Sequence, residues 1–408
     1  MSPRVVPCEA ELVIDELDAM ASGVGSLDGM RVRVPFALPG EKVRVRIWRI
    51  EAAKAQAQAD LLEVLVPHPQ RIAPRCSVFG QCGGCQLQSW SYLEQLNWKT
   101  KVVRDWFTPV DLGERVSPAI GSPREFGYRS KITPHYELIR PGQPFAVGFL
   151  RIGRRHDIVD APQCPLATDG INAALPALRA AAAVAVVGRK RGASLLLREG
   201  ALGVTDDPDA LIRERVGEIE LEFYAREFFQ NNPFLLPRLV DFVIDQAASF
   251  GVPILVDTYS GSGLFALSGA RRFERVLGVE VSAVAAAAAK RNAANNAIEN
   301  VEFQAAPAAK LFQGIAISGD DAVVIVDPPR KGSDEVFLSQ LVAFRPRGVI
   351  YVSCNPETAV RDLARLTTSG FRVRTIQPFD MFPQTRHIEC VAVLERSESD
   401  AAADSPRG

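Results

Sequence analysis

Residues 253–263 read Pro253-Ile-Leu-Val-Asp257-Thr-Tyr-Ser-Gly261-Ser-Gly263. The apolar run predicts a buried strand, and the glycines after it predict a tight turn that leads into a helix. A second apolar stretch, Arg275-Val-Leu-Gly-Val-Glu280, ends in a carboxylate. This pattern is typical of an α/β domain that binds a nucleoside, because the glycines let the ligand approach the backbone and the acid accepts the ribose hydroxyls.

The same alternation of strands and helices continues to residue 396. Apolar runs predict further strands, and amphipathic stretches between them predict helices. The expected strands cover 301–303, 322–327, 348–353, 371–379 and 388–395, and the expected helices cover 235–249, 282–296, 334–344 and 356–369. Alternation of this length predicts a parallel, doubly wound, Rossmann-like sheet in a domain spanning 226–396. The polar tail at 397–408 is expected to be disordered.

The glycine turn differs from the dinucleotide fingerprint of a dehydrogenase. Phe265 and Ala266 occupy the region where that fingerprint places its third glycine. S-adenosylmethionine carries no phosphate and therefore needs no pyrophosphate cradle. The turn thus favours a methyl-donor site over a dinucleotide site, and an ordinary tight turn is the structural alternative.

Two further strand ends carry reactive side chains. Asp327 begins the turn Asp327-Pro-Pro-Arg330, and Cys354 begins the turn Cys354-Asn-Pro356. Both should face the methyl donor, because ligands of open α/β sheets bind outside the carboxyl ends of the strands. Methyltransferases that act on amino groups favour an aromatic residue after the two prolines, whereas Arg330 stands here. A thiol beside an acid therefore suggests methylation of carbon.

Carbon 5 of a pyrimidine is a poor nucleophile, and a thiolate can activate it. If Cys354 adds to carbon 6, the resulting enolate can attack a methyl sulfonium, and a base must then remove the carbon-5 proton. Glu389 begins the last expected strand and is the candidate base, with His387 as its competitor. An inert buried thiol and an ordinary strand-edge carboxylate are the structural alternatives.

A group of cysteines lies upstream of this domain. Cys76, Cys82 and Cys85 fall within ten residues among glycines, and Cys164 is followed by Pro165. Thiolates at such spacing suit zinc or an iron–sulfur cluster, and spacing alone does not choose between them. Cys8 and Cys390 lack comparable surroundings. We expect an α+β domain over 67–225 with the metal site at one end.

The N-terminal region, residues 1–66, alternates apolar and polar residues between glycine-containing turns. This pattern predicts a small all-β unit, most simply a barrel. Its most basic stretch contains Lys42, Arg44, Arg46, Arg49 and Lys54. Such a face either follows a nucleic-acid backbone or is simply solvated.

The bulk composition of the 408-residue chain is that of an ordinary globular protein, with a net charge of −1. No run of eighteen apolar residues predicts a membrane span, and the first residues lack the apolar core of a signal peptide. We therefore expect a cytoplasmic monomer, in which cysteines serve as ligands or catalytic groups rather than in disulfides.

Taken together, these motifs resemble the RNA 5-methyluridine methyltransferases, the S-adenosylmethionine-dependent uracil-C5 enzymes of tRNA and ribosomal RNA. The resemblance implies an N-terminal RNA-binding TRAM barrel and a [4Fe–4S] cluster on Cys76, Cys82, Cys85 and Cys164. It also implies that Cys354 is the nucleophile and Glu389 the base. The methyl-donor contacts implied by the family motifs are Gln230, Tyr259, Gly261, Gly263, Glu280 and Asp327.

One segment departs from the family pattern, since 304–309 reads Gln-Ala-Ala-Pro-Ala-Ala where a polar or acidic residue usually lies near the adenine. The barrel and cluster together favour ribosomal RNA over tRNA as the substrate. Two other activities stay open. An RNA cytosine-C5 methyltransferase shares the thiol chemistry but usually has another cysteine where Arg330 and Lys331 stand. A non-catalytic RNA-binding protein with a vestigial methyltransferase domain is the second alternative.

Overall fold

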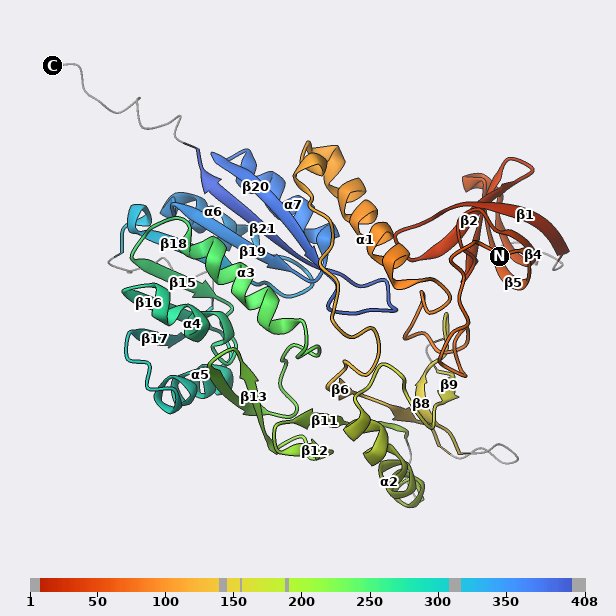
Figure 1. The fold of residues 1–408 in the computed structure, drawn as a ribbon, viewed down its shortest axis with the longest axis horizontal. Coiled ribbons are helices and arrows are strands. Elements are labelled where there is room, and N and C mark those ends of the chain that lie inside the picture. The colour runs from red at the N-terminus through yellow and green to blue at the C-terminus, as the bar shows by residue number, and fades with distance from the viewer. Residues whose placement is uncertain (1–7, 139–144, 155, 188–190, 308–316, 398–408) are drawn as a thin grey trace.

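The computed structural model describes residues 8–138, 145–154, 156–187, 191–307 and 317–397. Along the longest axis of the molecule, a small barrel stands at one end and a large sheet covered by helices at the other (Figure 1). The intervening region joins them. Within the described residues, no helix is both long and apolar enough to cross a membrane. Apart from Ser397, the tail that is expected to be disordered lies outside the described residues.

The barrel is closed by five strands in the order β1-β2-β3-β5-β4, which confirms the predicted all-β unit. Alternate residues such as Val32, Val34 and Val43 are fully buried inside it. The strands are β1 (Cys8–Leu17), β2 (Ser22–Leu27), β3 (Met30–Pro35), β4 (Lys42–Glu51) and β5 (Gln56–Val66).

The basic residues of the barrel are paired with acids. Arg44 lies 2.8 Å from Glu63, and Arg46 lies 3.1 Å from Glu9. Lys42, Arg49 and Lys54 likewise contact glutamates. This pairing is what a solvated strand face would show, and it lowers the net positive charge that the barrel presents.

The intervening region combines two helices with small antiparallel sheets. Two of the sheets have the strand orders β10-β7-β8-β9 and β12-β11-β6, and β13 pairs with β14. The elements are α1 (Tyr92–Phe107), β6 (Lys131–Ile132), β7 (His135–Tyr136), β8 (Val147–Leu150), β9 (Ile158–Asp160), α2 (Asp169–Ala185), β10 (Ala193–Ser194), β11 (Leu197–Gly200), β12 (Gly203–Thr205), β13 (Leu211–Val216) and β14 (Ile219–Tyr224).

The large sheet has seven strands in the order β17-β16-β15-β18-β19-β21-β20. Its strands are β15 (Ile254–Thr258), β16 (Arg275–Glu280), β17 (Val301–Ala305), β18 (Ala322–Val326), β19 (Gly348–Ser353), β20 (Phe371–Phe379) and β21 (Glu389–Arg396). The first five run parallel, and β21 is antiparallel to both of its neighbours. The doubly wound sheet predicted from the sequence is thereby confirmed.

Helices cover both faces of this sheet (Figure 1). They are α3 (Leu236–Ala248), α4 (Leu264–Gly269), α5 (Ala283–Asn295), α6 (Glu335–Phe344) and α7 (Pro356–Thr367). One apolar cluster joins α3, α4 and α5 to one face, and a second joins α6, α7 and α1 to the other. Every residue of β18 and β19 is buried, as expected for central parallel strands.

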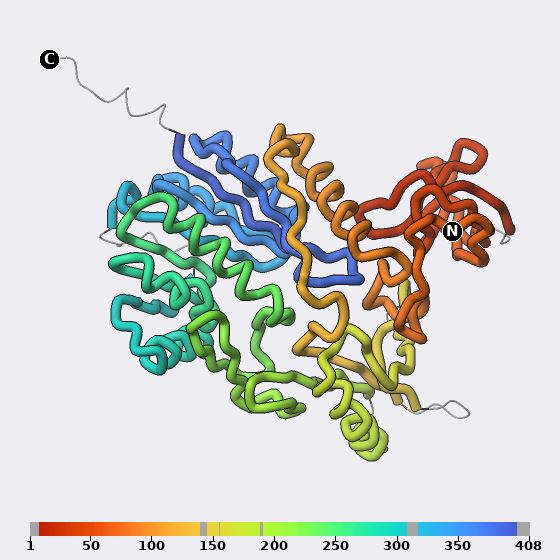
Figure 2. The backbone as a smooth tube through the Cα atoms, in the orientation of Figure 1, coloured from red at the N-terminus to blue at the C-terminus, as the bar shows by residue number. Residues whose placement is uncertain are grey.

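One loop of the sheet reaches into the intervening region. Residues 380–388 precede β21 and approach the chain near α1 (Figure 2). Gln86 and Leu87 both donate backbone hydrogen bonds to the Gln384 carbonyl at 3.1 Å. The Tyr128 hydroxyl donates to the Pro383 carbonyl at 3.0 Å. These contacts fix the loop immediately before Glu389, the first residue of β21.

Candidate active site

The predicted site residues gather at the carboxyl edge of the large sheet. β15, β18 and β19 are neighbours in the sheet, so the residues that follow them meet at one edge. Asp327 directly follows β18, and Cys354 directly follows β19. Because Ser353 pairs with Cys390 across β19 and β21, the next residues along, Cys354 and Glu389, are also brought together.

The turn after β15 depends on left-handed backbone conformations. Gly261 and Gly263 have positive φ values of 54° and 96°, and Tyr259 has a φ of 61°. The Gly261 N–H donates to Oε2 of Glu280 at 2.9 Å, and the Ser282 N–H donates to Oε1 at 2.7 Å. The carboxylate predicted to accept ribose hydroxyls is therefore held against the glycine turn.

Two buried polar atoms beside this turn have no hydrogen-bond partner among the residues that the structure describes. Oδ2 of Asp257 accepts from the Ala266 N–H at 2.9 Å, whereas its Oδ1 and the Ser260 hydroxyl are buried without a hydrogen bond. Burial raises the pKa of Asp257 well above its usual value, and repulsion from Asp327 and Glu280 raises it further. Three mutually repelling carboxyls fit a cationic ligand, and S-adenosylmethionine carries both a sulfonium and an ammonium group.

Two residues of this pocket were not predicted from the sequence. A Cβ atom at Gly278, in the middle of β16, would lie 2.4 Å from the Phe303 ring and 3.3 Å from the Ser260 hydroxyl. The same ring lies 3.1 Å from the position of a Cβ at Gly263. Phe303 therefore packs against the glycine turn. In the sequence, the glycine inside the strand, Gly278, was the feature that could have indicated this close packing.

The Cys354 thiol is half-buried among charged groups. Burial raises its pKa to about 11, repulsion from Glu389 and Asp327 contributes, and Arg330 opposes the shift. The turn that carries it is tied to the turn after β18, because Nδ2 of Asn355 donates to the Arg330 carbonyl at 3.1 Å. The thiol is consequently protonated at neutral pH in the absence of RNA.

Glu389 is 2% exposed. Burial raises its pKa well above the usual value, Asp327 raises it further, and the positive charge of Arg330 opposes both effects. Asp327 and Glu389 thus share one acidic environment, in which Arg330 is the nearby cation. A thiol, two carboxyls whose pKa values are raised and an arginine provide the groups needed for nucleophilic addition and proton transfer.

Comparison with known proteins identifies the family. The family described as tRNA (uracil-5-)-methyltransferase matches residues 168–397. A Schizosaccharomyces pombe tRNA (uracil(54)-C(5))-methyltransferase is 35% identical over 95% of this chain and 78% of that protein. The chain belongs to this RNA uracil-C5 methyltransferase family. The family predicted by resemblance is therefore confirmed, and of the three activities considered, uracil-C5 methylation with S-adenosylmethionine is the one that the family carries.

Other relatives span most of the chain. An uncharacterised RNA methyltransferase of Halalkalibacterium halodurans is 31% identical over 94% of this chain and 96% of that protein. The crystal structure of the Pyrococcus abyssi tRNA (uracil-54, C5)-methyltransferase in complex with S-adenosyl-L-homocysteine has a TM-score of 0.72 at 26% identity. It covers 94% of this chain and 100% of that chain. The likeness therefore includes the barrel and the intervening region as well as the methyltransferase domain.

Two other residues singled out from the sequence, Gln230 and His387, have weaker support in the structure for the roles considered for them. Gln230 is buried in the segment between β14 and α3, and no hydrogen bond joins its side chain to the glycine turn in the described part of the chain. Burial and the charges of Arg386 and Arg330 lower the pKa of His387 to about 4, so its imidazole is neutral at pH 7. The structure thus leaves the donor contact of Gln230 as a prediction and makes His387 a weaker base than an ionised Glu389.

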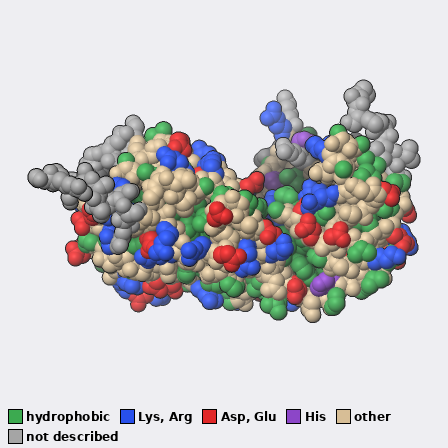
Figure 3. Space-filling view, turned by 90° about the horizontal axis from the view of Figure 1, so that it is seen from above, with side chains coloured by type: hydrophobic (Ala, Val, Ile, Leu, Met, Phe, Trp, Pro, Cys, Tyr) green, Lys and Arg blue, Asp and Glu red, His purple; other side chains and the backbone are tan. Residues whose placement is uncertain are grey.

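The four cysteines of the expected cluster line one cavity. This cavity has a volume of about 1130 Å³ and lies between the barrel and the intervening region. Figure 3 shows a hollow in the surface between the two halves of the molecule. Burial raises the pKa of the Cys85 thiol to about 12, and the neighbouring thiols of Cys164, Cys82 and Cys76 contribute. The chain therefore brings together sulfurs that lie far apart in the sequence.

These thiols do not form a compact site for a single metal ion. Among the described residues, no three His, Cys, Asp or Glu side chains converge closely enough to hold a metal ion. Cys8 is exposed and Cys390 is buried in the large sheet, so neither joins the group. The iron–sulfur cluster stays a prediction from the resemblance.

Proposed function

We propose that this RNA uracil-C5 methyltransferase modifies a uridine of tRNA, at the position corresponding to uridine 54. Two relatives whose names give a substrate are the tRNA (uracil(54)-C(5))-methyltransferases of Schizosaccharomyces pombe and Saccharomyces cerevisiae. The Pyrococcus abyssi structure with the same overall fold is of an enzyme with the same named target. These named targets favour tRNA over the ribosomal RNA that the barrel and the cysteine cluster suggested from the sequence.

The observation that supports this chemistry is that Cys354 and Glu389 lie at adjacent strand ends beside the acidic donor pocket. S-adenosylmethionine, when bound, supplies an electrophilic methyl group on its sulfonium. Cys354 gives its proton to solvent and its sulfur adds to carbon 6 of the uracil, which places the electron pair on carbon 5 and the carbonyl. Carbon 5 then takes the methyl group, and the electrons of the broken sulfur–methyl bond would leave with the donor as the neutral thioether S-adenosyl-L-homocysteine.

Glu389 completes the reaction by taking the proton from carbon 5. The electrons of that C–H bond re-form the carbon 5–carbon 6 double bond and expel the Cys354 thiolate. Glu389 has to be ionised for this step, and Arg330 stabilises the ionised form. His387 lies two residues before Glu389 and, being neutral, is suited to orienting the base by hydrogen bonding.

The donor pocket combines residues assigned from the sequence with Asp257. Glu280 and Asp327 supply acidic groups for the cationic donor, Asp257 offers its buried Oδ1, and the Tyr259-to-Gly263 turn lets the donor approach the backbone. Ala305 ends β17 and Ala306 follows it, and neither supplies a polar side chain for the adenine. We expect the adenine to rest on apolar surface there instead.

The cysteine cavity is proposed to hold a [4Fe–4S] cluster with a structural role. A single zinc ion with Zn–S bonds of about 2.3 Å would require the four sulfurs to converge tightly. A cuboidal cluster separates its thiolate ligands by its own iron atoms and suits a wider arrangement. Chemical analysis for iron and sulfide in anaerobically purified protein tests this, and a colourless protein with one zinc per chain would contradict it.

The barrel is proposed to contact RNA through the side that faces the cysteine cavity. Trp48 is 46% exposed and lines this cavity together with Arg33, Arg129 and Arg386. An exposed aromatic ring among arginines suits stacking on a base beside a phosphate. The protein would act as a monomer in this arrangement.

The direct test is to map 5-methyluridine in tRNA and in ribosomal RNA from cells that lack the protein. We expect the modification to disappear from tRNA and to persist in ribosomal RNA. Purified protein should restore it on a tRNA transcript in the presence of S-adenosylmethionine. Loss confined to ribosomal RNA would overturn the assignment of tRNA while leaving the uracil-C5 chemistry intact.

A further inference from the structure

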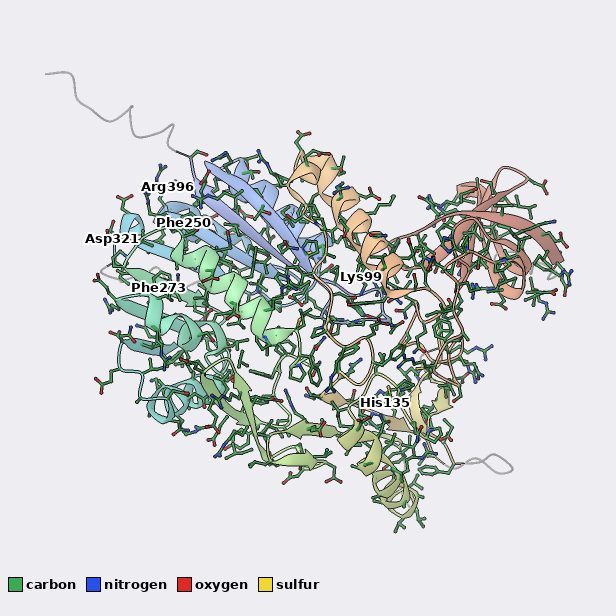
Figure 4. The ribbon with its side chains drawn as sticks, viewed as in Figure 1. Lys99, His135, Phe250, Phe273, Asp321 and Arg396 are labelled. Atoms are coloured by element: carbon green, nitrogen blue, oxygen red, sulfur yellow. The ribbon has the colours of Figure 1, made fainter. Side chains whose placement is uncertain are left out.

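A second charged pocket lies at the opposite end of the large sheet from the active site. Its volume is about 1120 Å³, and its charged lining comes from the turns before β18 and β19, the start of β20 and the end of β21. Phe250, which follows α3, also lines it, and Figure 4 shows Phe250 and Arg396 on the side of the molecule away from the barrel. The charged residues are Asp320, Arg345, Arg347, Arg372, Arg374, Glu395 and Arg396.

Arginines outnumber acids in the described lining of this pocket. Among the residues that the structure describes, five arginines and two carboxylates line it, although the whole chain has a net charge of −1. Glu395 accepts hydrogen bonds from both Arg372 and Arg374, and Asp320 accepts from Arg396. The two carboxylates therefore hold the guanidinium groups of Arg372, Arg374 and Arg396 in place.

Side-chain contacts position part of this cluster, and backbone contacts position the rest. Arg396 donates to the Arg345 carbonyl at 2.7 Å, and the guanidinium carbon of Arg374 lies 4.4 Å from the centre of the Phe250 ring. The Arg347 N–H donates to the carbonyls of Gly319 and Ala322 at 3.1 and 2.9 Å. These contacts fix the backbone that carries Arg347, whose side chain is exposed at the pocket.

Protection of a sheet edge does not explain the whole cluster. Arg372 and Arg374 lie on the edge strand β20, where charged residues discourage pairing with other chains. Arg345 and Arg347 lie in a turn, however, and Arg396 ends the inner strand β21. The positive charges also lie close enough to repel one another, because burial and the nearby charge of Arg372 lower the pKa of Arg374.

We propose that this pocket binds phosphate groups of the RNA backbone. Guanidinium groups recognise phosphate oxygens through paired N–H donors, and several of them around one open pocket suit a polyanion better than a single carboxylate. The proposal rests on the proposed function for its RNA, and it adds a contact far from the reacting base. β19 spans the sheet between the pocket and Cys354, which at about 3.3 Å per residue is on the order of 20 Å.

The test compares Arg347→Glu with Arg347→Lys and with Arg291→Glu. Arg347 is chosen because its replacement leaves the partners of Glu395 and Asp320 in place. Arg291 is an exposed arginine on α5, which packs against the opposite edge strand β17. Binding of a tRNA transcript is measured over a range of salt concentrations, and methyl transfer is measured at saturating RNA.

We expect Arg347→Glu to weaken tRNA binding several-fold and to reduce the salt dependence by about one ion, with kcat unchanged. Arg347→Lys should retain most of the affinity, and Arg291→Glu should match the wild type. Equal RNA affinity and equal salt dependence in all four proteins would overturn the assignment of the phosphates to RNA.

Titration with inorganic tripolyphosphate separates the RNA backbone from a small phosphate ligand. Tripolyphosphate binding that is lost in Arg347→Glu, with RNA binding unaffected, would support a phosphate site that serves a small ligand. If neither probe distinguishes the variant from the wild type, the pocket is not a phosphate site. Because this titration needs no methyl transfer, it also tests the pocket if tRNA proves not to be the substrate.

Discussion

Lys99 and Asp380 form a fully buried ion pair, with 2.5 Å between Nζ and Oδ1 and side-chain exposures of 1% and 0%. Lys99 lies on α1 (Figure 4), and Asp380 opens the loop that leads to Glu389. Lys99 also donates to the Phe382 carbonyl at 3.2 Å. The pair therefore anchors the loop that carries the candidate base to a helix of the intervening region.

Replacing Lys99 with methionine should destabilise this junction. The substitution leaves the Asp380 carboxylate buried without its counter-charge, which costs about 3–5 kcal/mol. The midpoint of urea unfolding measures the effect. Lys101→Met is the matched control, because Lys101 pairs with Asp105 on the exposed side of the same helix and should lose well under 1 kcal/mol. Equal midpoints for the two variants would contradict the anchoring role.

Glu389→Gln should stop the reaction after methyl transfer. Without the base, the methylated uracil keeps its bond to Cys354, so turnover should fall by about 10²–10⁴-fold and a covalent protein–RNA adduct should accumulate. Denaturing electrophoresis of the protein with tRNA and S-adenosylmethionine detects that adduct. The double variant Cys354→Ala/Glu389→Gln is the control and should give no adduct. Normal turnover in Glu389→Gln would transfer the role of base to another group, such as His387.

The Cys354 thiol should react slowly at neutral pH and faster as the pH rises. Its pKa of about 11 means that the thiolate fraction, and with it the alkylation rate, increases about tenfold per unit between pH 7 and pH 10. Mass spectrometry of the Cys354 peptide after iodoacetamide treatment gives this rate. Arg330→Gln should slow alkylation further, since the charge of Arg330 lowers the thiol pKa. A rate that levels off below pH 9 would show that the thiol is already ionised.

Gly278→Ala should weaken donor binding through Phe303. The new methyl group would lie 2.4 Å from the aromatic ring, so the ring that supports the glycine turn has to move. Overpacking of this kind costs about 1–3 kcal/mol, and calorimetry should show reduced affinity for S-adenosylmethionine. Gly278→Ala/Phe303→Leu frees space for the methyl group and should recover stability. Unchanged affinity in the single variant would mean that Phe303 does not shape the donor pocket.

Much of the methyltransferase domain could be predicted because its signals are local. The expected helices at 235–249 and 282–296 agree closely with α3 and α5. Gly261 and Gly263 predict the tight turn that the structure shows after β15. The positions of Asp327 and Cys354 also follow from the order of residues, since each ends an apolar run that can only be a buried parallel strand.

The chemical environment of those residues was decided by the tertiary structure. Glu389 reaches Cys354 because β21 runs antiparallel to β19, a direction that no residue in either strand specifies. Cys164 joins the other three thiols, and Lys99 meets Asp380, through packing between elements far apart in the chain. The five arginines of the second pocket come from three separate segments and form no motif in the sequence.

The sequence by itself determined which side chains stand at the strand ends, because strand periodicity and glycine turns are properties of neighbouring residues. The tertiary structure alone decided which of them share a buried space, because desolvation and charge repulsion depend on distances across the sheet. The raised pKa values of Cys354, Asp327 and Glu389 arise from that shared burial. A thiol at the end of a strand therefore becomes a candidate nucleophile only where the fold brings a donor pocket and a base to the same edge.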